Sequence, residues 1–242
     1  MALHAIPLTA PRKRSRKPWL LIPALLLVYL AIVAAWAWLS FDDAIASAPV
    51  TETVQLSERQ AAILLRVEDP RFYQHAGLSI GQGQGVATIS SALARDLFLV
   101  HGRLDGTRGL LQDAYRGVFA CCKRIDLGRD VMALVLDARL SKRAQLERYM
   151  ATVYMGTHQG RQIKGLEQAA RSYLGKPLAA ATEPEFVRLV AMIKAPNHYH
   201  PSKNPAALAQ RSGRIHALLL GACKPDGWFD TEFDGCASAA RG

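Results

Sequence analysis

The chain has 242 residues, of which 50% are hydrophobic and 21% are charged, and its formal net charge at pH 7 is +10. This apolar content excludes a disordered chain, and the length is enough for one domain with a buried core. Five of the positive charges lie within residues 12–17. The remainder carries about +5, which suits an anionic membrane surface or a lipid that bears pyrophosphate.

The first element in chain order is an apolar segment at residues 19–41, which contains 23 residues and no charge. At a rise of about 1.5 Å per residue, it is long enough to cross a bilayer as one transmembrane helix. Basic residues fill the preceding tail, residues 1–18, and Asp42 and Asp43 follow the segment. The positive-inside rule then leaves the tail in the cytoplasm and carries the rest across the membrane. No nucleic-acid partner is expected for a domain placed there.

A cleaved signal peptide is the alternative interpretation of this segment. The apolar region of a signal peptide has about 7–15 residues and ends in a small-residue cleavage site. The segment here is longer, and its best candidate site, residues 46–48, is followed by Pro49, which disfavours cleavage. We therefore favour an uncleaved anchor.

Beyond a linker at residues 42–56, the predicted domain at residues 57–221 consists of helices. Ser57 with Gln60 is typical of a capping box at a helix start, and Thr182 with Glu185 repeats that pattern. Residues 81–87 form a flexible Gly-rich loop, and glycines interrupt the helical period between residues 101 and 128. No segment alternates like a strand, so the predicted fold class is mainly α. The predicted helices cover residues 57–68, 88–100, 129–140, 143–155, 182–194 and 204–221.

The four cysteines fall into two pairs. Cys223 and Cys236 flank a short polar loop in the C-terminal tail, residues 222–242, and a location outside the cytoplasm permits a disulfide between them. Cys121 and Cys122 are adjacent, so a bond between them would be strained. No cysteine or histidine spacing indicates a zinc site, and no metal-binding residue is predicted.

Two adjacent carboxylates, Glu68 and Asp69, stand at the end of the first predicted helix of the domain, just before Pro70. Partial burial and a neighbouring charge both raise the pKa of a carboxylate, and such a group can act as a general base near neutral pH. The alternative is a solvated pair that merely ends the helix. The membrane anchor in front of the motif favours a functional role.

Several segments occur in the order of one known family. Glu68, Asp69, Phe72, His75 and Gly77 fill every position of its first motif. Similar segments follow at residues 85–99, 132–142, 169–176 and 195–201. Together they resemble the peptidoglycan glycosyltransferases (glycosyltransferase family 51), cell-wall polymerases that occur as monofunctional transglycosylases and as domains of bifunctional penicillin-binding proteins.

The resemblance implies a lysozyme-like helical fold with a small lobe partly embedded in the bacterial inner membrane, and a periplasmic domain. It implies polymerisation of a lipid-linked disaccharide pyrophosphate, lipid II, into glycan strands, with penicillin-binding proteins as partners. Glu68 matches the catalytic base. Lys or Arg side chains, or a divalent metal such as Mg²⁺ or Mn²⁺, would neutralise the pyrophosphate. The implied substrate-binding residues are Asp69, Phe72, His75, Thr88 and Arg95, although Arg95 can also be read as a solvated charge on a helix face.

The chain departs from the family pattern on the donor side of the site. Ser91 and Ala92 stand where the family usually has two glutamines. Arg129 stands where the family has its second catalytic Glu, and Asp130 is about 100° away around a helix. These two residues are the candidates for an altered second site. The segment between the first two motifs is also shorter than expected.

Two hypotheses follow from these matches and departures. One is an active monofunctional glycan-strand polymerase with an altered donor site, which the intact first motif favours. The other is a weak or inactive homologue that binds precursor or cell-wall synthases as an accessory protein, which Arg129 and Ala92 favour. A lysozyme-like hydrolase is a third alternative. No Ser-x-x-Lys occurs with the later motifs of a crosslinking domain, so no crosslinking activity is expected.

Overall fold

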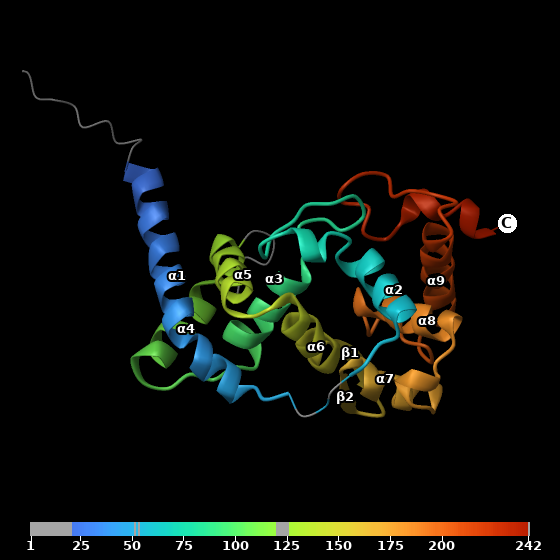
Figure 1. Cartoon of the computed structure of the whole chain (residues 1–242), viewed down its shortest axis with the longest axis horizontal. Coiled ribbons are helices and arrows are strands. Elements are labelled where there is room, and N and C mark those ends of the chain that lie inside the picture. The colour runs from blue at the N-terminus through green and yellow to red at the C-terminus, as the bar shows by residue number, and fades with distance from the viewer. Residues whose placement is uncertain (1–20, 51, 53, 120–125, 242) are drawn as a thin grey trace, which may run out of the picture.

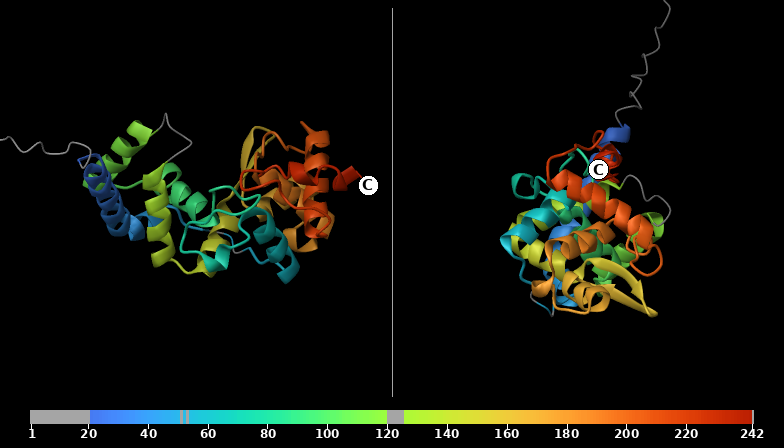
Figure 2. Two further views of the ribbon diagram at one scale, coloured as in Figure 1. Left: turned by 90° about the horizontal axis from the view of Figure 1, so that it is seen from above. Right: turned by 90° about the vertical axis from the view of Figure 1, so that its right-hand side faces the viewer.

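The computed structural model describes residues 21–50, 52, 54–119 and 126–241, and it is mainly helical (Figure 1). The basic cluster at residues 12–17 and the pair Cys121 and Cys122 lie outside the described residues. The molecule is elongated, with α1 (Leu21–Ser47) at one end and α9 (Pro205–Leu219) with the C-terminus at the other (Figure 2).

Among the described residues, α1 is the one helix that is long and apolar enough to cross a membrane, on length and composition alone. Residues 21–32 are exposed or half-buried, whereas Val33, Trp36, Ala37 and Phe41 further along the helix are buried in the core. The helix runs to Ser47, six residues past the predicted boundary at residue 41. The structure therefore joins the predicted anchor to the domain without a break.

Two helices pack against the second half of α1: α4 (Gly106–Phe119) and α5 (Leu127–Arg139). Residues 101–128 show no clear helical pattern in the sequence, yet α4 forms there. Its Gln112 is 1% exposed, and the Gln112 amide nitrogen donates to the carbonyls of Phe98 (2.6 Å) and Gly102 (2.9 Å). These tertiary hydrogen bonds hold a helix that its glycines disfavour locally.

The centre of the molecule consists of α2 (Glu58–Glu68), α3 (Ile89–Arg95) and α6 (Lys142–Thr152), with α5 against α3. The predicted helix at residues 88–100 is α in its first half and continues as one π-helical segment, η3 (Asp96–Val100). A 3₁₀ turn, η2 (Phe72–Gln74), follows α2. Residues of α2, α3 and α6 lie around Glu68.

One antiparallel hairpin, β1 (Tyr154–His158) and β2 (Arg161–Lys164), corrects the prediction that the domain has no strands and that a helix continues to residue 155. His158 pairs with Arg161, so Gln159 and Gly160 alone form the turn. Both have positive φ, 49° and 76°, as a two-residue hairpin turn requires. The strands are too short to give an alternating pattern that stands out.

The lobe farthest from α1 contains α7 (Leu166–Leu174), α8 (Glu183–Ile193) and α9, with a short turn, η4 (Leu178–Ala180), between the first two. An ion pair between Arg59 and Glu183, 2.7 Å long, links α2 to α8. After α9 the chain folds back over residues 81–87 and ends in two short turns, η5 (Asp234–Cys236) and η6 (Ala239–Arg241). The sulfur atoms of Cys223 and Cys236 are bonded, 2.01 Å apart.

Candidate active site

Glu68 is the last residue of α2, and the sequence fixes that helix at both ends. The Ser57 hydroxyl accepts from the Gln60 N–H (3.2 Å), and the Gln60 side chain accepts from the Ser57 N–H (3.0 Å), which completes the predicted capping box. At the other end, the Asp69 N–H still bonds to the Leu65 carbonyl (3.0 Å) before Pro70 interrupts the pattern. Glu68 is thus held on a rigid helix end.

The next residue, Asp69, is fully buried. Its carboxylate accepts from His75 Nε2 (3.0 Å), from the Gln84 amide (3.2 Å) and from the Ile89 N–H (3.0 Å). The Gly77 N–H donates to His75 Nδ1 (3.0 Å), so the His75 proton is on Nε2 and is donated to Asp69. Asp69 therefore ties the first motif to the start of α3.

Gly77 and Thr88 complete this internal frame. Gly77 has φ +99°, and a Cβ there would lie 2.6 Å from the Ala133 carbonyl oxygen of α5, so glycine is required. The Thr88 hydroxyl donates to the Gly77 carbonyl (2.6 Å). Thr88, Phe72 and the His75 side chain are almost completely buried. These residues position the site; direct contact with a substrate, predicted from the sequence, stays a prediction for them.

A pocket of about 100 Å³ opens beside Glu68, between α2, α3, α6, the end of α8 and the middle of α9. Tyr149, Lys194 and Arg211 line it. The Tyr149 hydroxyl donates to Glu68 Oε2 (3.2 Å). Arg211 is 3% exposed, and its Nε donates to the Ala191 carbonyl (3.0 Å). One carboxylate thus shares a small pocket with a phenol and two cations.

Burial raises the pKa of Glu68 above its usual value, and the negative charge of Asp69 adds to that rise. The positive charges of Arg211 and Lys194 and the Tyr149 hydrogen bond oppose it without cancelling it. Burial also lowers the pKa of Lys194, with help from Arg211 and against the charges of Glu232 and Glu68. A carboxylate with a raised pKa facing a small pocket is suited to act as a general base.

A second hollow, of about 450 Å³, adjoins the same helices further along. Ala92 lines the first pocket and Asp96 the second. On α6, Tyr149 lines the first pocket and Thr152 lines the second. Residues three or four apart share one helix face, so the two hollows follow one side of α3, η3 and α6. The first hollow lies beside Glu68, and the second is lined by Ala48 and Pro49 after α1 and by Lys164 of β2.

The second hollow contains a chain of polar side chains. Lys164 Nζ donates to His101 Nε2 (2.7 Å), and His101 Nδ1 contacts Asp96 Oδ1 (2.5 Å). Since an ammonium can only donate, the His101 ring carries its proton on Nδ1 and donates it to Asp96. Thr152, Gln168 and Arg171 supply further polar groups. Such a lining is suited to a hydroxyl-rich ligand.

Comparison with known proteins identifies the family to which the chain belongs. The sequence profile of the family described as Transglycosylase matches residues 43–219. This chain belongs to the transglycosylase family. Its members are peptidoglycan glycosyltransferases with a lysozyme-like, mainly helical domain, as the sequence motifs predict.

Penicillin-binding proteins are among the relatives of this transglycosylase domain. The chain is 31% identical to penicillin-binding protein 1B of Escherichia coli over 170 residues, which are 64% of this chain and 18% of that protein. It is 31% identical to penicillin-binding protein 1B of Vibrio cholerae over 180 residues, 69% of this chain and 21% of that protein. With penicillin-binding protein 1A of Pseudomonas aeruginosa it shares 28% over 160 residues, 65% of this chain and 18% of that protein. The chain thus matches about a fifth of the length of these curated relatives.

Three predicted residues of the transglycosylase site lie away from the Glu68 pocket. Arg95 is exposed at the end of α3 and is not among the residues that line the pocket. Arg129 and Asp130, in the first turn of α5, contact each other, with Arg129 Nη2 3.5 Å from Asp130 Oδ1. The structure thus pairs the two second-site candidates with each other. Substrate binding by these three residues stays a prediction.

A metal site is also not apparent in the part of the chain that the structure describes. No group of three or more histidine, cysteine or acidic side chains there is arranged to hold a metal ion. A divalent metal bound together with a pyrophosphate stays a prediction, because the phosphate oxygens would themselves be ligands.

Sequence reasoning did not identify Tyr149, Lys194, Arg211 or Gln84 as parts of the site. Lys194 lies next to the segment at residues 195–201 that matches the family, and Tyr149 lies on a predicted helix, so the sequence could have indicated both residues. Arg211 is hidden in an ordinary helical pattern, and only its burial reveals it. A charge buried on an apolar helix face can be recognised once the fold is known.

Proposed function

We propose that this chain is a peptidoglycan glycosyltransferase that joins lipid-linked disaccharide pyrophosphates, such as lipid II, into glycan strands. The observation that carries the proposal is Glu68, a half-buried carboxylate with a raised pKa that shares a pocket with Lys194 and Arg211. The family match supplies the reaction class.

In the proposed reaction, Glu68 removes the proton from the sugar 4-hydroxyl of the acceptor. The resulting oxygen nucleophile attacks the anomeric carbon of the donor, and the bond from that carbon to the polyprenyl pyrophosphate breaks. One carboxylate acting as base and one departing group are what a single displacement at an anomeric carbon needs. The raised pKa keeps Glu68 basic enough to accept this proton near neutral pH.

The departing pyrophosphate gains negative charge as the bond breaks, so cations near it lower the barrier. Lys194 and Arg211 stand beside Glu68, and Arg95 stands exposed on α3. We assign Lys194 and Arg211 to the acceptor side with Glu68, and Arg95 to the pyrophosphate. The hollow around His101 and Lys164 then accommodates further sugar units of the strand.

We further propose that α1 anchors the chain in the bacterial inner membrane as a single span and leaves the domain in the periplasm. A lipid-linked substrate has its reactive pyrophosphate at the membrane surface, so an anchored enzyme meets it in two dimensions. The exposed apolar first half of α1 and the buried second half support an uncleaved anchor that is continuous with the domain. Penicillin-binding proteins that crosslink strands are the proposed partners.

The second candidate function is an accessory protein that binds precursor or a synthase without polymerising. Arg129 favours this function, because its guanidinium pairs with Asp130 and cannot supply the negative charge of a second carboxylate.

An assay with the purified full chain in detergent and lipid-linked disaccharide precursor separates the two functions. The polymerase hypothesis expects glycan strands from the wild type and none from Glu68→Gln. Precursor binding without strands in both proteins would establish the accessory function. Strand formation that survives Glu68→Gln would show that another group is the base.

A further inference from the structure

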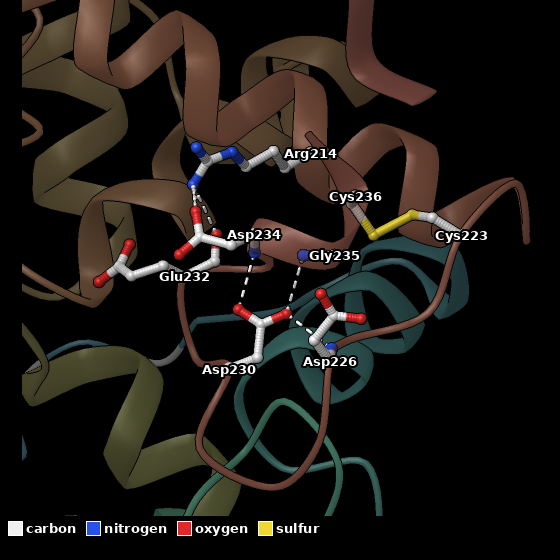
Figure 3. The surroundings of a disulfide bond; sticks show 8 residues. All are labelled: Arg214, Cys223, Asp226, Asp230, Glu232, Asp234, Gly235 and Cys236. Atoms are coloured by element: carbon white, nitrogen blue, oxygen red, sulfur yellow. Dashed lines mark hydrogen bonds and ion pairs between the residues drawn. A yellow bond between two sulfur atoms is a disulfide. The ribbon is translucent and has the colours of Figure 1, made fainter. Parts of the chain in front are cut away.

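The segment after α9, residues 222–236, is a closed loop, which we call the tail loop. The Cys223–Cys236 disulfide joins its ends. Inside it, the Asp230 carboxylate accepts from the N–H groups of Asp226 (2.8 Å), Asp234 (2.7 Å) and Gly235 (3.1 Å) (Figure 3). The tail loop lies beyond residues 43–219, which match the transglycosylase family.

The tail loop binds the glycine-rich segment at residues 81–87, which borders the Glu68 pocket. The Gly83 N–H donates to the Gly227 carbonyl (3.0 Å), and the Gly85 N–H donates to the Trp228 carbonyl (2.8 Å). Gly83 has φ +74°, and a Cβ there would lie 2.6 Å from Pro225 Cγ. Between these two glycines, Gln84 donates to Asp69. The tail loop therefore supports the segment that helps to fix Asp69.

The tail loop also binds both cations that stand beside Glu68. Lys194 Nζ donates to the Thr231 hydroxyl (2.6 Å). Arg211 Nη1 donates to the Thr231 carbonyl (3.0 Å) and to Glu232 Oε2 (2.8 Å). Thr231 itself lines the pocket. A single short stretch of the tail loop thus sets the direction of the two positive charges.

Phe233 shows that this arrangement is a packed structure and not a loose terminus. Its φ is +56°, a conformation that residues with a Cβ rarely adopt without support. The side chain is 2% exposed, and its ring lies 5.3 Å from the Arg211 guanidinium carbon. Burial of this ring against Arg211 compensates for the unfavourable backbone.

We propose that the tail loop is one wall of the catalytic pocket and that Thr231 is a positioning residue that holds the Lys194 ammonium beside Glu68. For its effect on catalysis, this inference rests on the proposed polymerase function. A lysine side chain is flexible, so a fixed acceptor decides where its charge lies. If the ammonium moves away, Glu68 loses a nearby positive charge, and its pKa rises further.

The first test compares Thr231→Val, which removes the acceptor at constant size, with Thr231→Ser, which keeps it. In Thr231→Val we expect kcat/KM for strand formation to fall on the order of tenfold, because misplaced catalytic groups lower rates steeply. The acid limb of its pH–rate profile should move to higher pH, because Glu68 then has the higher pKa. Thr231→Ser should restore both. A Thr231→Val profile identical to that of the wild type would overturn the role of Thr231.

The second test does not require activity. The rate at which the Lys194 amine is acylated, read by mass spectrometry, should increase in Thr231→Val and stay unchanged in Thr231→Ser. Amide hydrogen exchange in residues 79–88 should accelerate in the double variant Cys223→Ser, Cys236→Ser, because Gly83 and Gly85 lose their acceptors. The double variant Cys121→Ser, Cys122→Ser, which keeps the tail-loop disulfide, is the matched control.

The two tests distinguish the inference from the function on which it rests. If the wild type forms no strands but Lys194 labelling increases in Thr231→Val, the polymerase function is rejected. The proposal that the tail loop is a wall of the pocket is then supported. If neither Lys194 acylation nor amide hydrogen exchange responds to any of these substitutions, the proposal that the tail loop is a wall of the pocket is rejected, whatever the activity.

Discussion

At the scale of single residues, Glu68 is held in a state that works against folding. Burial makes its ionised form less favourable in the native protein than in the unfolded chain, where it is solvated. The two nearby cations and Tyr149 relieve only part of this cost. A site that keeps a carboxylate basic therefore lowers the stability of the domain, as is common for catalytic groups.

Glu68→Gln should consequently raise stability while it removes activity. The native pKa lies above the ordinary value of 4.5, so below about that pH the group is protonated in both states and costs nothing. The cost grows as the pH rises and is complete above the native pKa. Each pKa unit corresponds to about 1.4 kcal/mol. Thermal unfolding should show a gain for Glu68→Gln of about 2–4 °C per kcal/mol at pH 7.5 and none at pH 4.

The same variant should lose strand formation by about 10²–10⁴-fold, as removal of a general base does. Glu183→Gln is the matched control, because Glu183 is a surface carboxylate paired with Arg59. It should leave the rate unchanged. A Glu68→Gln protein that is less stable than the wild type at pH 7.5 would contradict the raised pKa.

Asp69→Asn should act in the opposite direction and destabilise the protein. Asp69 is fully buried, and donors from His75, Gln84 and Ile89 converge on its carboxylate. The Asn side chain would place its own N–H donors opposite these donors, and buried polar groups would be left without a hydrogen-bond partner. We expect a loss of about 3 kcal/mol in urea unfolding. Asp130→Asn, at a partly exposed position, is the control; an equal loss in both variants would refute the role of the buried network.

At the scale of elements, the sequence predicted those helices whose ends carry local signals. Capping residues such as Ser57 and Asn204 mark helix starts, and the structure begins α2 and α9 directly after them. The helix α4 was not predictable, since long-range hydrogen bonds from Gln112 stabilise it against its own glycines. The π-helical end of α3 and the β1–β2 hairpin were likewise decided by packing.

The residues of the candidate site also fall into two groups: those that a local motif predicts and those that only the tertiary fold brings together. The first motif predicted Glu68 and Asp69, because the spacing of its residues is a local property, and the structure places these two residues at the end of α2 and directly after it. Lys194, Arg211 and Thr231 come together from α8, α9 and the tail loop, far apart in the chain. Only the tertiary fold brings them to Glu68, so a pattern read along the sequence could not assign them.

The disulfide of the tail loop should stabilise the protein. Its disulfide closes a loop with a sequence separation of 13, for which the loss of loop entropy predicts a stabilisation of about 2–3 kcal/mol. Mass spectrometry of the non-reduced protein should find Cys223 linked to Cys236, and Cys223→Ser with Cys236→Ser should lower the midpoint of thermal unfolding. Free thiols at both positions in protein taken from an oxidising compartment would contradict this pairing.

The tail loop should also loosen in acid. Burial alone would raise the pKa of Asp230, but the N–H groups of Asp226, Gly235 and Asp234 together lower it below 3.8. A carboxylate with a lowered native pKa stabilises the native state above its unfolded pKa and loses that effect as the pH falls through the native value. Amide exchange in residues 222–236, corrected for pH, should therefore accelerate below about pH 3.8 in the wild type. Asp230→Asn should show fast exchange already at neutral pH.

At the scale of the whole molecule, α1 and the rest of the chain form a single packed unit. Phe41 and Ala44 of α1 are buried in the same core as the helices around Glu68. Arg148 of α6 donates to the Ala48 carbonyl (2.6 Å) directly after the helix. Cleavage after Ala48 would remove all of α1 and its buried side chains from this core, which argues against a signal peptide on stability grounds.

The last prediction concerns topology. The C-terminus lies at the end of the molecule farthest from α1 (Figure 1), so a reporter fused there should not disturb the predicted membrane helix. We expect a reporter that works only outside the cytoplasm to be active, because the basic cluster at residues 12–17 keeps the N-terminus inside. The matched control lacks residues 1–47 and should give an inactive reporter. A fusion that is active only in the cytoplasm would reverse the proposed orientation, and a mature protein that begins at Pro49 would replace the anchor by a cleaved signal.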